Sequence, residues 1–199
     1  MHTVEKPHRI LLIDDNPAIH DDFRKILLAD SRDSELDDFE AQVFGDILDE
    51  HASPVPYRID SAFQGRDGFE MAQRAKAEAL PYSVAFVDVR MPPGWDGIET
   101  VRNIWKHCPE LQIVLCTAFS DYSWAQMHKI LGASDGLFIL KKPFDNVAVL
   151  QLASALTRKW QLAVELKTRM DTLEGRVEQL IRELALAREE IAALRNANK

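Results

Sequence analysis

The chain has 199 residues, of which 46% are hydrophobic and 28% charged, and its 24 basic and 32 acidic residues give a formal net charge of −8. This composition is typical of a folded globular protein rather than a disordered one, and the negative charge argues against non-specific nucleic-acid binding, which needs a positive face. No apolar run approaches the ~20 residues of a membrane span, and residues 1–7 lack the apolar core of a secretory signal, so we expect a cytoplasmic protein without a membrane partner.

Short apolar runs alternate with helical patterns along most of the chain. Strands are expected at 9–14, 57–63, 83–88, 111–116 and 137–141, and helices at 17–28, 65–79, 97–107, 120–131 and after residue 143. Asn16 is a suitable N-cap for the first helix, and Pro17 suits its first position. Five strands alternating with five helices predict an α/β fold, a doubly wound, five-stranded parallel sheet with helices on both faces.

Polar residues stand at the carboxyl ends of these strands, where ligands bind in such sheets. The first strand ends in Asp14 and Asp15, the third ends in Asp88, the fourth ends just before Thr117, and the fifth is followed by Lys142. Three close carboxylates repel one another unless a cation lies among them, and hard oxygen ligands suit Mg²⁺ and phosphate oxygens. A single Asp here is most simply a turn residue, but the five positions together predict a magnesium and phosphate site.

The chain resembles the response-regulator receiver domain of two-component signalling, a flavodoxin-like fold, over residues 8 to about 158. The resemblance is carried, in the family's order, by LLIDDN (11–16), FVDVRMPPGWDG (86–97), CTA (116–118) and KKPF (141–144). It implies that Asp88 is the phosphoacceptor, which is modified by a sensor histidine kinase or a phosphotransfer protein. Such a receiver catalyses its own phosphotransfer and dephosphorylation, and we expect no separate catalytic domain within these residues.

The resemblance also implies a bound Mg²⁺ ion as the cofactor. Its ligands would be the carboxylates of Asp14, Asp15 and Asp88 and the backbone carbonyl of Arg90. The ion would offset the charge repulsion between the attacking carboxylate and the phosphoryl group. Thr117 would donate a hydrogen bond to the phosphoryl group, and Lys142 would add a positive charge beside its oxygens. Asp88, Thr117 and Lys142 are therefore the expected catalytic residues.

The sequence departs from the family pattern at several places. The loop MPPGWDG (91–97) carries one residue more than is usual before the Asp-Gly turn. Ile139 stands where an aromatic switch residue is usual, and Phe138 beside it points to the opposite face of the strand. Pro143 follows either a cis peptide that aims Lys142 or a trans peptide at a helix start.

The connection at 30–56 is much longer than is usual between the first helix and the second strand. Apolar residues recur there at helical spacing, and Ser34 is a suitable N-cap, so we expect an extra helical insert. Residues 30–53 hold nine acidic residues against one Arg. The simpler interpretation is a helix packed on its own domain with a solvated acidic face, and the alternative is a docking surface for a basic partner.

The C-terminal part of the chain carries a heptad pattern. With Val149 as position a, thirteen of the fifteen a and d positions are apolar in one unbroken frame. We therefore expect a receiver domain at 1–158 and, at 159–199, a helix that continues from the last receiver helix into a parallel coiled coil. Charges at the flanking g and e positions favour a parallel homodimer over a helix that folds back on its own domain; the opposite-charge pairs are Arg169–Glu174, Glu183–Arg188 and Glu190–Arg195.

The coiled-coil frame is still in phase at Lys199. The receiver followed by a coiled coil resembles the receiver–coil units that precede diguanylate cyclase domains or histidine kinase cores. This resemblance implies that the dimer transmits phosphorylation to an output domain absent from these residues, for which we expect a diguanylate cyclase. Two alternatives remain: a stand-alone dimeric receiver that acts by protein binding, and the receiver portion of a hybrid histidine kinase. A phosphatase of the haloacid-dehalogenase type fits poorly, because it needs a second Asp two residues after the nucleophile, where this chain has Arg90.

Overall fold

The computed structural model describes residues 7–28, 57–118, 129–132 and 134–197. The chain divides into two compact units, Met1–Trp160 and Gln161–Lys199. The helical insert expected at 30–56 and most of the helix expected at 120–131 lie outside the described residues. Among the described helices, none has both the length and the apolar character that crossing a lipid bilayer requires.

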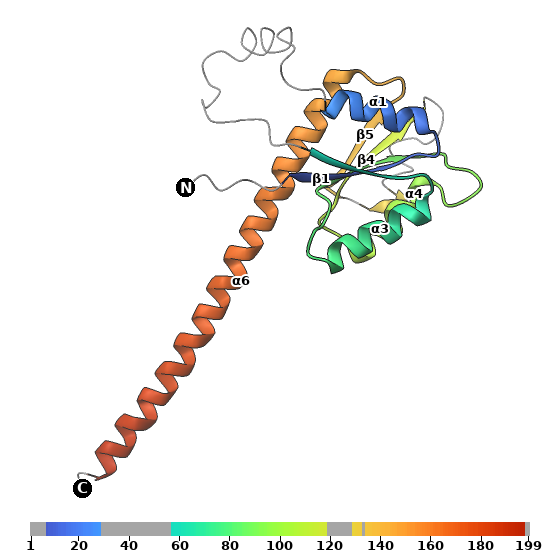
Figure 1. Ribbon diagram of the computed structural model, residues 1–199. Helices are drawn as coiled ribbons and strands as arrows, with labels where there is room; N and C mark the ends of the chain where they lie inside the picture. The colour runs from blue at the N-terminus through green and yellow to red at the C-terminus, as the bar shows by residue number, and fades with distance from the viewer. Residues whose placement is uncertain (1–6, 29–56, 119–128, 133, 198–199) are drawn as a thin grey trace, which may run out of the picture. The chain divides into compact units, whose positions relative to one another are not determined.

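The first unit is built on a five-stranded parallel sheet with the strand order β2-β1-β3-β4-β5 (Figure 1). The strands are β1 (His8–Ile13), β2 (Tyr57–Ala62), β3 (Val84–Asp88), β4 (Gln112–Thr117) and β5 (Leu137–Lys141). The described helices are α1 (Pro17–Leu28), α3 (Gly65–Ala77), α4 (Gly97–His107) and α6 (Asn146–Ala197). The predicted flavodoxin-like α/β fold with a long C-terminal helix is confirmed, and β4 extends one residue further than expected, so that Thr117 belongs to it.

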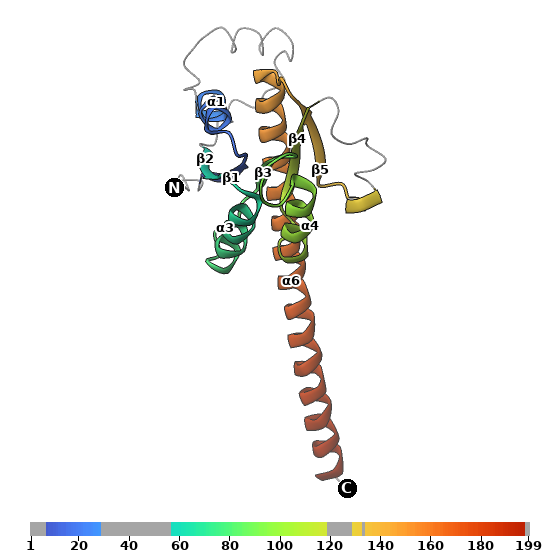
Figure 2. The same cartoon turned by 90° about the vertical axis from the view of Figure 1, so that its right-hand side faces the viewer.

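Alternate residues of each strand face opposite sides of the sheet, and each side has its own apolar cluster. On one side, Leu11 and Ile13 of β1 pack with apolar residues of α3 and α4. On the other side, Ile10 and Leu12 pack with apolar residues of α1 and of the first turns of α6. Figures 1 and 2 show α1 on the face of the sheet opposite α3 and α4. All five residues of the central strand β3 are buried, as predicted for a strand covered on both faces.

The first turns of α6 belong to the packing of the first unit. Val149, Ala153 and Leu156 are at most 3% exposed and lie in the second apolar cluster. Lys159, a polar residue at a heptad d position, forms an ion pair with Asp135 (Nζ to Oδ2, 3.1 Å). Up to Lys159, therefore, this helix uses its heptad residues within the receiver unit.

The second unit consists of the remaining part of α6, from Gln161 to Ala197. Within this unit, the large apolar side chains at heptad positions a and d are between 43% and 65% exposed from residue 166 to residue 184. This exposed stripe consists of Leu166, Met170, Leu173, Val177, Leu180 and Leu184. An apolar stripe of this length costs free energy in water unless another surface covers it.

Candidate functional site

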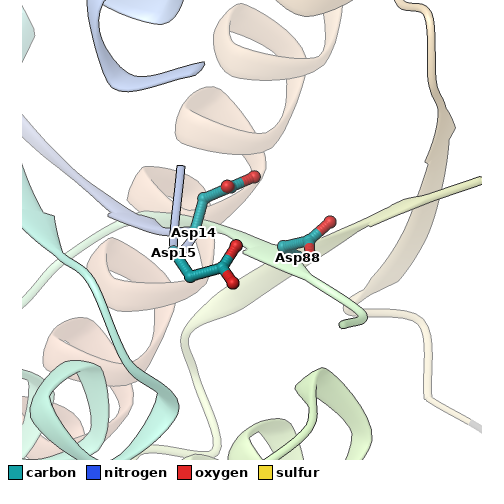
Figure 3. A group of neighbouring side chains, drawn as sticks. All are labelled: Asp14, Asp15 and Asp88. Atoms are coloured by element: carbon teal, nitrogen blue, oxygen red, sulfur yellow. The ribbon is translucent and has the colours of Figure 1, made fainter. Parts of the chain in front are cut away.

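Three carboxylates meet at the carboxyl ends of β1 and β3, which are neighbours in the sheet. Ile13 of β1 pairs in register with Val87 of β3, so the residues that follow them emerge side by side. Asp14 and Asp15 follow β1, and Asp88 is the last residue of β3. Figure 3 shows the three side chains gathered together, and one carboxylate oxygen from each lies within 4.8 Å of the others. This is the juxtaposition that the sequence predicts.

Asp14 is held in one orientation by its surroundings. Its side chain is almost fully buried, its Oδ1 accepts a hydrogen bond from the backbone N–H of Asn16 (2.9 Å), and its Oδ2 accepts one from Lys142 Nζ (2.8 Å). Its own N–H donates to the carbonyl oxygen of Ala62 at the end of β2 (3.2 Å). Asp15, in contrast, is exposed, so the pair offers one fixed and one solvent-accessible carboxylate.

Lys142 links two of the three carboxylates. Its Nζ lies 2.8 Å from Asp14 Oδ2 and 2.7 Å from Asp88 Oδ1. Its backbone N–H donates to the carbonyl of Thr117 (2.8 Å). The peptide bond between Lys142 and Pro143 is cis, so of the two isomers considered from the sequence the structure has the cis form. Burial alone would lower the pKa of Lys142, but the hydrogen bonds and charges of the two carboxylates raise it, so the ammonium stays protonated.

Asp88 combines burial with hydrogen bonds to both of its oxygens. Besides the contact of Oδ1 with Lys142, Oδ2 accepts a hydrogen bond from the backbone N–H of Arg90 (3.0 Å). Burial raises the pKa of Asp88, and the charge of Asp14 adds to this effect. Lys142 and the Arg90 amide act in the opposite direction, and the net result is a raised pKa. The carboxylate is therefore more basic than an exposed Asp, which suits a nucleophile.

The remaining two predicted site residues lie beside this cluster. Thr117, at the end of β4, is 5% exposed and donates a hydrogen bond from Oγ1 to the carbonyl of Ala118 (2.9 Å). It pairs in register with Lys141, so it lies at the strand end next to Lys142. Arg90 contacts Asp88 through its backbone N–H, and its side chain is exposed. All six predicted site residues are thus at the carboxyl end of the sheet.

The loop with the extra residue is anchored at both ends. Met91 is buried, and its carbonyl accepts a hydrogen bond from the N–H of Gly94 (3.2 Å). The Trp95 ring packs against Phe69 of α3, with the ring centres 5.8 Å apart. The peptide bond of Pro92–Pro93 is cis, which the sequence did not predict. The extra residue is thus accommodated in the turn while the loop stays packed on α3.

Ile139 and Phe138 of β5 point to opposite faces, as predicted. Ile139 packs against the apolar cluster under α3 and α4. Phe138 packs against the cluster that contains α1 and the start of α6. The position that usually carries an aromatic switch residue is therefore filled by a partly buried, branched aliphatic side chain that packs against the core.

His20 touches the site and was missed by reasoning from the sequence. It is 1% exposed, and its Nε2 lies 2.8 Å from the carbonyl oxygen of Asp14. The sequence contains a signal for it, because His20 shares the buried face of α1 with Phe23 and Leu27 at helical spacing. That spacing predicts burial, but it does not identify the group that the imidazole contacts.

The carboxylate cluster fits a divalent metal ion. Carboxylates are the hard oxygen donors that Mg²⁺ prefers, at Mg–O distances of about 2.1 Å. Oxygens that already lie within 4.8 Å of one another can reach one ion with small side-chain movements. Such a site keeps open positions for water and for phosphate oxygens.

The comparisons with known proteins agree with this geometry. The family model of the response regulator receiver domain matches residues 37–154. A solved structure described as an adenylate cyclase from Rhodopirellula baltica is 18% identical, with a TM-score of 0.61, and the alignment covers 83% of this chain and 98% of that one. A CheY-like receiver domain protein from Methanospirillum hungatei JF-1 is 20% identical, with a TM-score of 0.53, and the alignment covers 79% of this chain and 99% of that one. Chemotaxis protein CheY4 from Vibrio cholerae is also 20% identical, with a TM-score of 0.52, and the alignment covers 76% of this chain and 99% of that one. No curated protein matches the chain in sequence.

The family match includes Asp88, Thr117 and Lys142 but begins after the Asp14–Asp15 pair. In the sequence, the long connection at 29–56 lies between this pair and the other site residues. In the structure, β1 takes its place beside β3 and brings the pair to Asp88. The solved structures, at their low identity, show the shared fold, and the family match covers more than half of the chain. The chain therefore belongs to the response regulator receiver domain family of two-component signalling.

Proposed function

We propose that this protein is a phosphoacceptor response regulator, which takes a phosphoryl group onto Asp88 with Mg²⁺. The donor would be a sensor histidine kinase or a phosphotransfer protein. The observation that supports this proposal is the cluster of Asp14, Asp15 and Asp88 within 4.8 Å, together with Lys142 in contact with both Asp14 and Asp88. A surface cluster of turn residues would not need a partly buried, positively charged side chain placed between two of its carboxylates.

Each residue of the cluster has a defined task in this proposal. A carboxylate oxygen of Asp88 forms a bond to phosphorus while the bond from phosphorus to the imidazole nitrogen of the donor breaks, and that nitrogen keeps the electron pair. Asp14, Asp15 and the Arg90 carbonyl would hold the metal with Asp88, and bound Mg²⁺ would supply positive charge against the repulsion between the reactants. Lys142 adds its charge, and the hydroxyl of Thr117 donates a hydrogen bond to the new phosphoryl group.

Phosphorylation by a small-molecule donor tests this assignment. Incubation of the full chain with acetyl phosphate and Mg²⁺ should add the mass of one phosphoryl group, measured by intact-mass spectrometry. Asp88→Asn should remove the adduct, because an amide is not a nucleophile toward phosphorus. Asp96→Asn is the matched control, because Asp96 caps α4 through Glu99 N–H (2.7 Å) and Asn caps equally well. An undiminished adduct in Asp88→Asn would contradict the proposal.

We further propose that the segment 159–199 forms a parallel coiled coil between two copies of the chain, with 1–158 as the receiver. The exposed stripe from Leu166 to Leu184 occupies the a and d positions, where a partner helix would cover it. In that arrangement Arg169 meets Glu174 of the partner helix and Glu183 meets Arg188, and both pairs are opposite in charge. A change in the packing of the two receivers would then reach the coiled coil.

The proposed consequence is control of an output domain beyond these residues, for which a diguanylate cyclase is our first candidate. A stand-alone dimeric receiver and the receiver of a hybrid histidine kinase are the alternatives. The mass of the native polypeptide, measured on protein isolated from its source cells, separates the stand-alone alternative from the other two. Cyclic dinucleotide synthesis by that polypeptide then separates a cyclase from a kinase.

A further inference from the structure

We infer that His20 is a positioning residue, which fixes the Asp14–Asp15 turn in the geometry that binds Mg²⁺. This inference rests on the proposed function, because it concerns the same metal site. His20 lies in α1, whereas the proposed metal ligands lie at the end of β3 and on the segments that follow β1 and β3. Its action on the ion would therefore pass through the backbone of Asp14.

The imidazole of His20 is enclosed and hydrogen-bonded at both nitrogens. Nε2 lies 2.8 Å from the carbonyl oxygen of Asp14, and Nδ1 lies 2.8 Å from Oγ of Ser61 on β2. The ring of Phe63 lies over it, with the ring centres 4.6 Å apart, and the exposed fraction of His20 is 1%. His20 thus joins α1, β2 and the metal-binding turn through two short hydrogen bonds.

The partners determine which nitrogen carries the proton. A carbonyl oxygen can only accept, so Nε2 donates to Asp14. Arg24 donates from its guanidinium to Oγ of Ser61 (2.6 Å), which leaves the Ser61 hydroxyl hydrogen available for Nδ1. The chain of donors runs from Arg24 through Ser61 and His20 to Asp14, and it fits an imidazole that carries a proton on Nε2.

The hydrogen bond from His20 acts on both aspartates at once. The carbonyl of Asp14 belongs to the peptide unit that joins Asp14 to Asp15, so holding this oxygen fixes the plane of that unit. The carboxylate of Asp14 is held separately by Asn16 and Lys142. Without the Nε2–H donor, the buried carbonyl loses this hydrogen bond, and the Asp14–Asp15 peptide unit loses a contact that fixes its plane. Outer contacts that orient metal ligands typically change metal affinity about 10-fold to 100-fold.

Isothermal titration of the full chain with Mg²⁺ alone measures this effect. His20→Phe keeps a ring of similar size without a donor, and it should weaken Mg²⁺ binding at least about 10-fold. His20→Gln, whose amide N–H can replace Nε2–H, should restore most of the affinity. His107→Phe is the matched control, because His107 lies on α4, is exposed, and touches Asn103 and Phe69 rather than the site. It should bind Mg²⁺ like the parent protein.

Two further measurements separate positioning from a purely structural role. Thermal unfolding of the same variants shows whether the fold is retained, and a lowered Tm for His20→Phe with parental Mg²⁺ affinity would overturn the inference. If His20→Phe does not fold, Ser61→Ala replaces it as the test, because it removes the contact of Ser61 with Nδ1 of His20. Weakened Mg²⁺ binding by Ser61→Ala would support the inference, and Mg²⁺ binding equal to that of the parent protein would overturn it. Ring ¹⁵N shifts should show a proton on Nε2 of His20, and an Nε2 without a proton would also overturn the inference.

Mg²⁺ binding by the Asp15→Ala variant shows whether a negative result concerns the role of His20 alone or the proposed metal site as well. Loss of Mg²⁺ binding in Asp15→Ala together with parental binding in His20→Phe would overturn the role of His20 alone. Unchanged binding in Asp15→Ala, or no binding by the parent protein, would overturn the metal site and the role of His20 with it.

Discussion

Asp60 on β2 forms a polar network that ties the first strands of the sheet together. Its Oδ2 accepts a hydrogen bond from Arg9 of β1 (2.5 Å) and another from the hydroxyl of Tyr82 (2.9 Å), which precedes β3. The guanidinium of Arg9 also lies over the Tyr82 ring, 4.3 Å from its centre. Three side chains distant in sequence therefore contact one another at a partly buried position.

This network makes the stability of the receiver sensitive to acid. Burial would raise the pKa of Asp60, but the hydrogen bonds from Arg9 and Tyr82 and the charges of Arg9 and Arg58 together lower it. A folded-state pKa below the unfolded value of about 3.9 contributes stability above that value, and this stability is lost as the pH falls through the folded-state pKa. Asp60→Asn should cost about 1–3 kcal/mol at pH 7, and the cost should shrink below about pH 4.

Urea unfolding of the parent and Asp60→Asn at a series of pH values measures this difference. Asp22→Asn serves as the control, because the contact of Asp22 with the described part of the chain is an exposed ion pair with Lys25 at 3.5 Å. A pair of that kind contributes at most about 1 kcal/mol. A difference between parent and Asp60→Asn that stays constant across the pH range would contradict the expected proton linkage.

The site residues differ in how far the sequence reveals them. Asp14, Asp15, Asp88 and Lys142 could be predicted because the ends of parallel strands meet at one edge of the sheet. The role of His20 depends on its contact with Ser61, which lies 41 residues further along the chain. No local pattern encodes that contact, because it arises only when β2 pairs with β1 and α1 packs over both.

At the scale of elements, α4 begins in direct contact with the strand that carries Asp88. The N–H of Gly97 donates to the carbonyl of Val89 (2.9 Å). A Cβ atom on Gly97 would lie 2.3 Å from the carbonyl oxygen of Asp88 and 2.9 Å from Cα of Val89. Both are backbone atoms, so any side chain at this position would displace the end of β3.

Gly97→Ala should therefore destabilise the receiver by about 1–3 kcal/mol, the usual cost of overpacking. It should also slow the modification of Asp88 by acetyl phosphate, because the displaced strand end carries the nucleophile. Gly175→Ala is the control: it lies within α6, and a Cβ there meets no atom within 4 Å. That change should stabilise the helix by up to about 1 kcal/mol. Thermal unfolding and intact-mass kinetics measure both effects, and parental values for Gly97→Ala in both would refute the expectation.

The elements also show where prediction from the sequence ends. The sequence predicts α4 and β5 with the bounds that the structure shows, and it predicts β3 to within one residue. The cis peptides before Pro93 and Pro143 could not be chosen from the sequence, because the two isomers of an X-Pro bond differ by only about 0.5–1 kcal/mol. Tertiary packing decides between isomers so close in free energy, and it also gives the loop 91–97 its shape.

At the scale of the whole molecule, one heptad frame serves two environments. Val149 and Leu156 are buried within the receiver unit, whereas Leu166 to Leu184 are largely exposed in the second unit. Lys159 stands between these two stretches in sequence and contacts Asp135. The proposed dimer assigns the exposed stretch alone to the interface between copies.

Leu173→Glu combined with Leu180→Glu should convert the proposed dimer into a monomer. Each dimer would then carry four carboxylates in a seam that excludes water, where unpaired charges are costly. Thr172→Glu with Gln179→Glu is the matched control, because it adds the same charge at heptad position c, away from the seam. Size-exclusion chromatography with light scattering reports the mass of each variant. A dimer that persists in the leucine variant would place the interface elsewhere in the chain.

The exposed stripe has a consequence for how the signal depends on protein abundance. Most of the stability of a helix in water comes from packing of its apolar face, and within the second unit the stripe is largely uncovered. In the proposed dimer, folding of residues 161–197 and pairing of two chains are therefore one coupled equilibrium, governed by mass action. At low copy number the segment would spend more time unpaired and frayed, and a phosphorylated receiver would have a less rigid helix through which to act. Expression level and phosphorylation would then act jointly on the strength of the response.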